Sequence, residues 1–435
     1  MHWLKWSILL SLGVGVICLP GKEGEEAALH ISNGGNTQQL RLLLGVITPE
    51  ALTVEQEHFC ANIKRCLNFS GQFGLTLKRV KKLPDAKHIQ KLYAKGYDCI
   101  VFMEYPSATK KEQTCTWWLE GEKKQTYSME LGQEDSLSYQ LATSVLFELT
   151  GQQQPFLSKI AYRKKQNNIC SLCVADFDGL HGQNLYTSSR IVAAPVWNND
   201  TSHPALAFSQ FTPSNVRIVG CDLQGNQRVL LDLDGTSVGL SYAPTGKSVA
   251  YCRSGKIWLY TYDTKRKRAV HSLVINELGV CGSPVMLANG DIIYCTRGKI
   301  KYYEAATKKR RVLTQNGYCV GSAYTPATQR VVYSRRVNGY MQLFVYDMLR
   351  DTHEQVTFAS KRKGDIDHCS HKIDPCWSPC GQYCAFGWEQ GKESRIGIIH
   401  VGTKEYHLVT PLGVECSYPA WSPFYEVLPS IRPRG

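Results

Sequence analysis

The residues of this chain whose types and spacing most suggest chemistry surround a glycine-flanked serine. Gly235-Thr-Ser-Val-Gly239 matches the G-x-S-x-G pattern of a nucleophile elbow, in which Ser237 would attack an acyl carbon. That chemistry requires a strand, a sharp turn and a helix, with Asp and His later in a hydrolase domain. Here the pentad falls between two β-like stretches, and no hydrolase pattern follows it. The sequence therefore favours a turn over a catalytic Ser237.

Three further patterns resemble redox or metal sites. Cys170-Ser-Leu-Cys173 has redox or zinc spacing, but residues three apart on a strand lie on opposite faces, and no second pair follows at zinc-site spacing. Asp176-Phe-Asp-Gly179 and Asp232-Leu-Asp-Gly235 resemble the start of a calcium loop without its remaining ligands, and Asp-Gly turns explain them better. We therefore predict no metal, no cofactor and no catalytic residue.

The chain is strongly basic. Its formal net charge of +13 favours acidic partners or anionic surfaces through long-range attraction. The clearest basic clusters lie at residues 78–82, 265–268, 308–311 and 361–363. Three of these clusters fall where we expect connections between strands, so solvated turns explain them better than a nucleic-acid-binding stripe.

Cysteine usage leaves two interpretations open. Of the 17 cysteines, only Cys18 lies in the apolar N-terminal stretch. In an oxidising compartment the others could pair, or many could be small buried apolar side chains. Matching repeat positions make a disulfide between Cys281 and Cys319 conceivable, and Cys376 and Cys384, which flank one turn, are a second candidate pair.

Residues 1–21 have the pattern of an export signal. Lys5 precedes an apolar stretch that is shorter than the roughly 20 residues needed to cross a bilayer, and Pro20-Gly21 ends it. The polar segment 22–38 is expected to be flexible. No later stretch is apolar enough for a membrane helix, so we expect an exported chain without a membrane span.

Residues 39–152 alternate between strand-like and helix-like stretches. Residues 40–47 are continuously apolar apart from Arg41 and Gly45, which indicates a buried strand, and residues 97–104 give a similar pattern. Helical spacing of apolar residues follows at 52–67 and again at 136–150, where Gly151 ends the pattern. This region is therefore predicted to be a small α/β domain.

From residue 158 to residue 435 the pattern changes to short strands at regular spacing, which is typical of an all-β repeat. A small residue or proline, one spacer and a bulky residue recur six times. The bulky residues of the six copies are Trp197, Tyr242, Met286, Tyr324, Trp377 and Trp421. Their separation is near the length of a four-stranded blade, so the pattern predicts a six-bladed β-propeller.

The ends of the repeat region indicate how the ring closes. The sixth copy, Pro419–Pro423, is followed by too few residues for three more strands. Three strand-like stretches instead precede the first copy, beginning near Lys159. The last blade is therefore expected to combine one C-terminal inner strand with three N-terminal strands, which leaves no open sheet edge.

The anchors Pro375-Cys-Trp-Ser-Pro-Cys-Gly381 and Pro419-Ala-Trp-Ser-Pro423, with Ile160-Ala-Tyr162 and Val174–Gly179, resemble the blade signatures of the TolB family. The order of export signal, α/β domain and propeller is similar as well. The second, third and fourth anchors depart from the family pattern because they lack tryptophan. The high cysteine content is a further departure.

The resemblance implies a non-enzymatic periplasmic adaptor. In that family the propeller mouth binds the peptidoglycan-associated lipoprotein Pal, the segment after the signal contacts the inner-membrane protein TolA, and together they serve outer-membrane integrity and constriction at division. The TolA-like contact here would be residues 22–38. The mouth residues would come from the loops entering the inner strands: Thr236, Ser237, Cys281, Gly282, Cys319, His371, Asp374, Ser417 and Tyr418. Thr236 stands where family members often carry a histidine.

Two other classes of function stay open. A propeller enzyme, either a hydrolase or a lyase, would need an acid/base set clustered in the channel. A binder of anionic glycans or lipid surfaces would show strong salt dependence spread over the basic turns.

Overall fold

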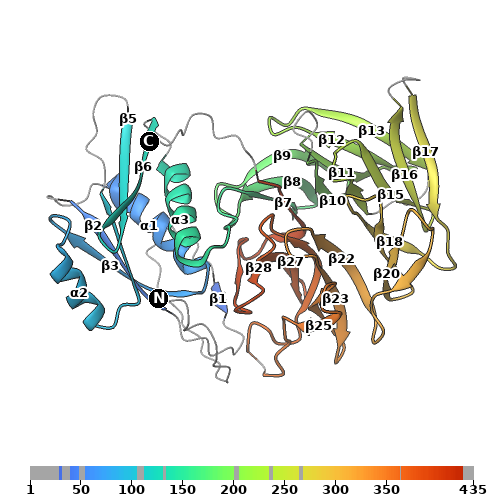
Figure 1. The fold of residues 1–435 in the computed structure, drawn as a ribbon. Helices are drawn as coiled ribbons and strands as arrows, with labels where there is room; N and C mark the ends of the chain where they lie inside the picture. The colour runs from blue at the N-terminus through green and yellow to red at the C-terminus, as the bar shows by residue number, and fades with distance from the viewer. Residues whose placement is uncertain are drawn as a thin grey trace. The chain divides into compact units, whose positions relative to one another are not determined.

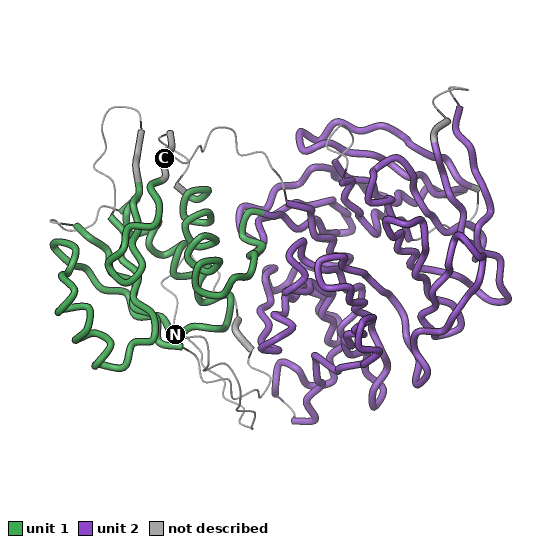
Figure 2. Tube along the Cα trace, in the orientation of Figure 1, with its two compact units in different colours: residues 1–15, 34–157, 425–435 green, residues 16–33, 158–424 purple. Residues whose placement is uncertain are grey.

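The computed structural model describes residues 29–31, 40–48, 54–104, 112–130, 134–199, 205–234, 239–263, 268–362 and 364–424. They form two compact units, one of residues 40–157 and one of residues 158–424 together with 29–31 (Figure 2). The expected export signal and most of segment 22–38 lie outside the described residues. Among the described helices, none is long and apolar enough to cross a membrane.

The first unit is a five-stranded mixed sheet with three helices. In sheet order its strands are β3 (Phe73–Val80), β2 (Leu40–Ile47), β4 (Cys99–Glu104), β5 (Glu112–Leu119) and β6 (Glu122–Glu130). Its helices are α1 (Val54–Phe69), α2 (Ala86–Ala94) and α3 (Glu134–Thr150). The α/β character predicted for this region is confirmed.

The apolar run in β2 follows from its central place in this sheet. β2 pairs in parallel with β3 on one side and with β4 on the other. Because both crossovers are right-handed in such units but run in opposite directions, α1 and α2 are expected on opposite faces. α2 packs with Leu43 and Phe102, while α1 packs against α3. A strand covered on both faces must be apolar on both.

The second unit is the predicted propeller of six blades (Figure 1). From inner to outer strand, blade 1 is β10 (Val192–Trp197), β11 (Leu206–Phe211), β12 (Asn215–Cys221) and β13 (Gln227–Asp234). Blade 2 is β14 (Leu240–Tyr242), β15 (Ser248–Arg253), β16 (Lys256–Asp263) and β17 (Arg268–Ile275). Blade 3 is β18 (Cys281–Met286), β19 (Ile292–Thr296), β20 (Lys299–Tyr303) and β21 (Arg310–Val312).

Blades 4 to 6 complete the ring. Blade 4 is β22 (Cys319–Thr325), β23 (Arg330–Val337), β24 (Tyr340–Asp347) and β25 (Thr352–Gln355). Blade 5 is β26 (His371–Trp377), β27 (Tyr383–Gln390), β28 (Glu393–His400) and β29 (Tyr406–Leu408). Blade 6 is β30 (Glu415–Trp421), β7 (Lys159–Gln166), β8 (Ile169–Asp176) and β9 (Gln183–Ser188).

The composition of blade 6 confirms the predicted closure. The C-terminal strand β30 pairs antiparallel with β7, with Trp421 opposite Ile160. At the end of this pair the Ser422 N–H donates to the Lys159 carbonyl at 2.8 Å, and the Lys159 N–H donates to Ser422 Oγ at 2.9 Å. The two ends of the propeller are therefore joined by hydrogen-bonded strand pairing.

A short strand from the N-terminal segment adds to blade 5. β1 (Leu29–Ile31) pairs antiparallel with β29, with Leu29 opposite Leu408 and Ile31 opposite Tyr406. Three residues of segment 22–38 thus form a fifth strand at the outer edge of that sheet.

The bulky repeat residues join neighbouring blades. The Trp197 indole of blade 1 donates to the Ala420 carbonyl of blade 6 at 2.8 Å, and the Trp377 indole of blade 5 donates to the Ala323 carbonyl of blade 4 at 3.2 Å. Both acceptors directly precede the anchor of the preceding blade. In blade 3, where the anchor is Met286, the link is made instead by its backbone N–H, which donates to Ser241 Oγ of blade 2 at 3.0 Å.

We predict that Ser241→Ala destabilises the chain by about 1 kcal/mol, because the Met286 N–H then loses its acceptor between two blades. The measurement is the free energy of unfolding in urea. Ser248→Ala is the control, since that hydroxyl bonds to Thr261 within its own blade, at 3.3 Å. A larger loss in the control than in Ser241→Ala would contradict the inter-blade role.

The described cysteines are free thiols, so the two candidate disulfides are not formed. Cys281 packs in a core shared by blades 2 and 3, whereas Cys319 packs in a separate core between blades 3 and 4. Cys384 lies opposite Trp377 rather than opposite Cys376, so the two thiols lie on opposite faces of their blade. Within the described part of the chain, packing is the interpretation that the structure supports.

Candidate protein-binding site at the propeller mouth

The inner strands share a backbone feature that the sequence did not reveal. Each has a residue with positive φ three positions before its bulky anchor: Ala194 (49°), Gly239 (104°), Ser283 (47°), Gly321 (54°), Asp374 (48°) and Tyr418 (54°). In five blades the pairing with the second strand shifts register at this point. Such a bulge takes one residue out of the ladder and changes the direction of its side chain. The side chains of Asp374 and Tyr418 therefore point in a different direction from the one that regular strand pairing would give them.

The described residues among those predicted for the mouth lie in the first four positions of the inner strands. Cys281 and Gly282 begin β18, Cys319 begins β22, His371 and Asp374 lie in β26, and Ser417 and Tyr418 lie in β30. Thr236 and Ser237 lie outside the described residues. These residues come from equivalent inner strands of the repeated blades, but their side chains make different contacts.

Three of these side chains, those of Cys281, Cys319 and His371, make contacts within the propeller. Cys281 and Cys319 are buried, and desolvation raises the pKa of both thiols. His371 Nδ1 accepts a hydrogen bond from the Met341 N–H at 3.2 Å, and the ring meets Tyr340 edge-on. Since Met341 and Tyr340 belong to blade 4, His371 connects two blades. Gly282, in contrast, faces open space.

Asp374, Tyr418 and two residues from second strands form a cluster where blades 5 and 6 meet. The Arg163 guanidinium of β7 lies 5.1 Å from the centre of the Tyr418 ring. Asp374 is influenced electrostatically by Arg163 and by Glu389 of β27. The cluster thus combines an arginine, a tyrosine and two carboxylates on the inner part of the ring, and we call these four residues the mouth cluster.

Burial raises the pKa values of two residues in the mouth cluster, Asp374 and Tyr418. Desolvation raises the pKa of Asp374 to about 6; the Glu389 carboxylate adds to the rise, and Arg163 opposes it. Desolvation, reinforced by Asp374, also raises the pKa of Tyr418. At neutral pH Asp374 is therefore ionised in a setting that only partly compensates its charge.

Two polar atoms, one in the mouth cluster and one next to it, have no hydrogen-bond partner among the described residues. They are Ser417 Oγ and Arg163 Nε, and both atoms are buried. Ser417 lies directly before Tyr418 and opposite Arg163 in the β30–β7 ladder. Buried polar atoms without partners are costly, and such atoms also occur elsewhere in the described chain. At this position a bound partner or a water would complete the hydrogen bonds.

Sequence reasoning missed Arg163 and Glu389 because it considered only the loops entering inner strands. Both residues lie on second strands, where the pairing register places Arg163 opposite Ser417 and Glu389 opposite His371.

The patterns first singled out for chemistry are structural where they are described. Cys170 and Cys173 are both buried on β8, where Cys173 Sγ donates to Asn184 Oδ1 at 2.8 Å. The Asp176 carboxylate is already held by Lys159 at 2.9 Å and by His181 at 2.8 Å. In the described part of the chain, no group of three or more His, Cys, Asp or Glu side chains could hold a metal ion.

Comparison with known protein families identifies the family to which this propeller belongs. The family described as "TolB beta propeller domain" matches residues 147–425, which is more than half of the chain. The chain belongs to the TolB β-propeller family. The resemblance inferred from the blade anchors is confirmed.

Individual TolB sequences match only in part. A Tol-Pal system protein TolB from Methylobacillus flagellatus is 32% identical over 94 residues, which cover 22% of this chain and 21% of that protein. One from Francisella tularensis subsp. mediasiatica is 24% identical over 149 residues, covering 31% and 34%. The matched segments thus span about a fifth and a third of these relatives.

The fold similarity to TolB extends much further than the sequence similarity. The crystal structure of TolB from Acinetobacter baumannii aligns with a TM-score of 0.73 at 18% identity, covering 91% of this chain and 99% of that one. Both units of this TolB-family chain therefore have counterparts in a solved TolB fold.

Proposed function

We propose that this chain is a non-enzymatic periplasmic adaptor of a Tol-Pal-like system, exported by residues 1–21. Its propeller mouth binds a Pal-like lipoprotein, and residues 22–38 contact a TolA-like inner-membrane protein. In this role it helps to maintain outer-membrane integrity and envelope constriction during division. The observation that carries the proposal is a TolB-family propeller in which Tyr418 and Arg163 lie together where blades 5 and 6 meet, with Ser417 Oγ and Arg163 Nε buried there without partners among the described residues.

The mouth cluster has the composition of a protein-binding site. Tyrosine and arginine are the residue types that most often dominate interface energies, particularly in desolvated surroundings. A partner that supplies a donor to Asp374 and an acceptor to Arg163 would satisfy groups that are poorly compensated in the free chain. The mouth cluster therefore favours a polar protein surface as ligand.

The test is calorimetric binding of the mature chain to the soluble domain of the organism's own Pal-like lipoprotein. We expect Tyr418→Ala and Asp374→Ala each to weaken binding by at least about tenfold, as central interface residues do. Thr352→Ala, on the exposed outer strand β25, is the matched control and should leave the affinity unchanged.

Three outcomes would count against parts of the proposal. The absence of binding by a well-folded chain at high concentration would overturn the lipoprotein assignment. If both mouth variants bound with the affinity of wild type, the binding site would lie elsewhere on the chain. Binding that disappears with added salt and depends on the basic turns would support the anionic-glycan alternative instead.

A further inference from the structure

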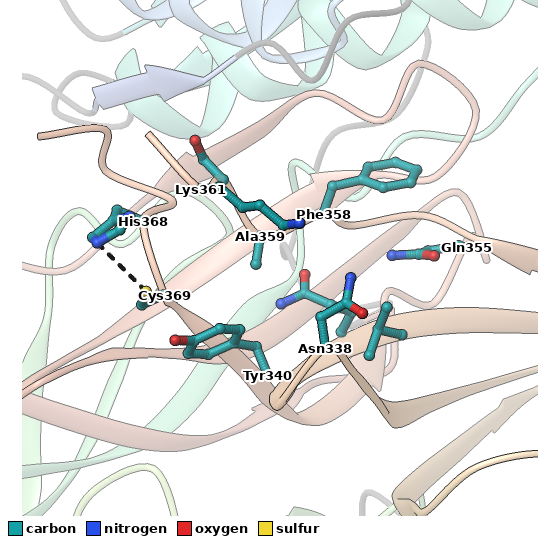
Figure 3. A pocket seen from close by; sticks show the side chains of 11 residues that line it. Asn338, Tyr340, Gln355, Phe358, Ala359, Lys361, His368 and Cys369 are labelled. Carbon is teal, nitrogen blue, oxygen red and sulfur yellow. Dashed lines mark hydrogen bonds between the residues drawn. The ribbon is translucent and has the colours of Figure 1, made fainter. Parts of the chain in front are cut away.

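A cavity that the proposed function does not use lies where the chain enters blade 5. It has a volume of about 420 Å³ and lies beside the connection between β25 and β26 (Figure 3). Its lining includes Tyr340, His368 and Cys369. A cavity of this size is in the range that holds small molecules.

The cavity contains a thiol with a base beside it. His368 Nε2 lies 3.4 Å from Cys369 Sγ, and the two side chains meet at the edge of the cavity (Figure 3). Tyr340 also lines the cavity, and the neighbouring Cys369 thiol raises the pKa of its hydroxyl. A nucleophile within reach of a base is the arrangement that activates cysteine for attack.

Cys369 differs from the other described cysteines. Only Cys99, Cys369 and Cys376 are partly exposed, and all the others are buried. Burial raises the pKa of Cys99 to about 11 and that of Cys376 to about 12, which keeps both as unreactive thiols. Cys369 thus combines exposure, a neighbouring imidazole and a cavity.

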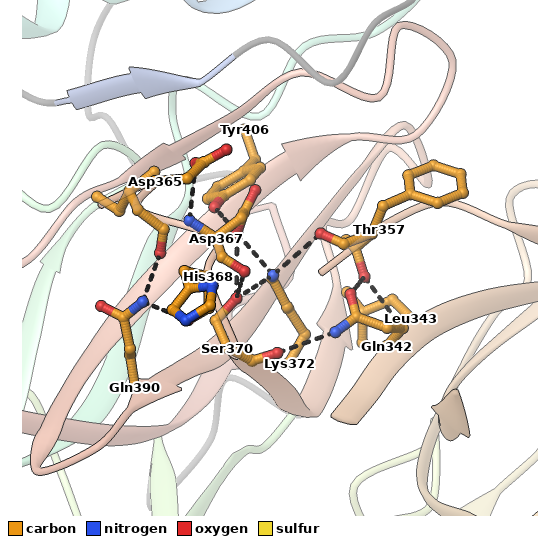
Figure 4. A network of polar contacts seen from close by, with 12 residues as sticks. Gln342, Leu343, Thr357, Asp365, Asp367, His368, Ser370, Lys372, Gln390 and Tyr406 are labelled. Carbon is orange, nitrogen blue, oxygen red and sulfur yellow. Dashed lines mark hydrogen bonds and ion pairs between the residues drawn. The ribbon is translucent and has the colours of Figure 1, made fainter. Parts of the chain in front are cut away.

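The turn that carries this pair is firmly held (Figure 4). The Cys369 N–H donates to the Ser360 carbonyl at 3.3 Å, and Gln390 Nε2 donates to the His368 carbonyl. Next to the pair, Lys372 Nζ donates to Asp367 Oδ1 and to Ser370 Oγ, both at 2.6 Å. The backbone that carries the thiol and the imidazole is therefore held in place by the surrounding contacts.

The remaining lining indicates the chemical class of the ligand. Phe358 and Val337 supply apolar surface, Gln355 supplies an amide, and Lys361 supplies a positive charge. A small peptide disulfide that carries carboxylates matches this combination, because Lys361 attracts the carboxylate while the amide can bond to a peptide group.

We propose that Cys369 is a site of mixed-disulfide formation with low-molecular-weight, carboxylate-bearing peptide disulfides. The Cys369 thiol gives its proton to His368 Nε2, and the sulfur then attacks one sulfur of the disulfide. The old S–S bond breaks, and its electron pair leaves on the second sulfur, which takes the proton from His368. The products are one mixed disulfide and one free thiol.

The test uses the full folded chain and glutathione disulfide as the probe. Intact mass and peptide mapping are expected to show a single glutathione adduct at Cys369. The adduct should be absent in Cys369→Ser and unchanged in Cys99→Ser and Cys376→Ser, which remove the other two partly exposed thiols. First modification at any other cysteine would overturn the proposal.

Two further variants test the roles of the cavity residues. His368→Gln should slow the reaction at least about tenfold and change its pH–rate profile, because the base is lost. Lys361→Met should slow the reaction with glutathione disulfide but not with the uncharged hydroxyethyl disulfide. Equal rates in His368→Gln and wild type would refute the base, and equal losses with both probes in Lys361→Met would refute the carboxylate recognition.

Discussion

Replacing Lys372 with methionine is expected to destabilise the chain by about 3–5 kcal/mol. The Lys372 side chain is fully buried in β26, and its ammonium lies 2.6 Å from Asp367 Oδ1 (Figure 4). Removing the lysine leaves a buried carboxylate whose remaining side-chain donors include the Tyr406 hydroxyl. The measurement is urea unfolding at neutral pH.

A surface ion pair between blades 4 and 5 provides the matched control. Lys404 lies 2.7 Å from Glu354, but the glutamate is 60% exposed, so Lys404→Met should cost less than about 1 kcal/mol. The double variant Lys372→Met with Asp367→Asn should recover part of the loss, because no unpaired charge then remains in the core. Similar losses in Lys372→Met and Lys404→Met would contradict the structural role.

The architecture of the propeller was predictable from the sequence because each blade repeats the same local pattern. The six bulky anchors from Trp197 to Trp421 mark inner strands at blade-length intervals, and strand-like stretches before the first anchor supply the other strands of blade 6. The apolar run of β2 likewise indicated a strand covered on both faces. Such features depend on residue type and on the spacing of the repeat, and both can be read in the sequence.

The mouth cluster was less predictable because it depends on register and on backbone conformation. Nothing in the residue types of Asp374 or Tyr418 indicates a positive φ, which is commonly a property of glycine. Arg163 reaches the mouth only through pairing with a strand more than two hundred residues away. Lys372 is charged and lies near the start of an inner strand, yet it is a core residue because Asp367 compensates its charge.

Asp374→Asn is the second substitution with a large expected effect, and the size of that effect depends on pH. Asp374 has a pKa of about 6 in the folded chain against an ordinary value of 3.8, chiefly because of desolvation. A carboxyl whose folded pKa is raised contributes stability below its unfolded pKa and loses that contribution as pH rises through the folded pKa. Wild type is therefore expected to lose about 2–3 kcal/mol from this group between about pH 4 and pH 7.

The neutral amide of the Asp374→Asn variant avoids this loss. Asparagine also tolerates the φ of 48° found at this position better than most residues, so the backbone need not change. We expect Asp374→Asn to be more stable than wild type at pH 7.5, and the difference to disappear near pH 4, when both are followed by urea unfolding. Asp232→Asn, on the exposed outer strand β13, controls for the change in net charge.

A stabilised Asp374→Asn chain that also binds the lipoprotein domain more weakly would show that stability and binding are opposed at this residue. The ionised carboxylate is costly in the free chain chiefly because it is desolvated; Glu389 adds repulsion, and Arg163 compensates only in part. A donor or cation from the partner would remove that cost on binding, and the same carboxylate would then favour the complex. Equal stability of Asp374→Asn and wild type at both pH values would refute the desolvation on which this argument depends.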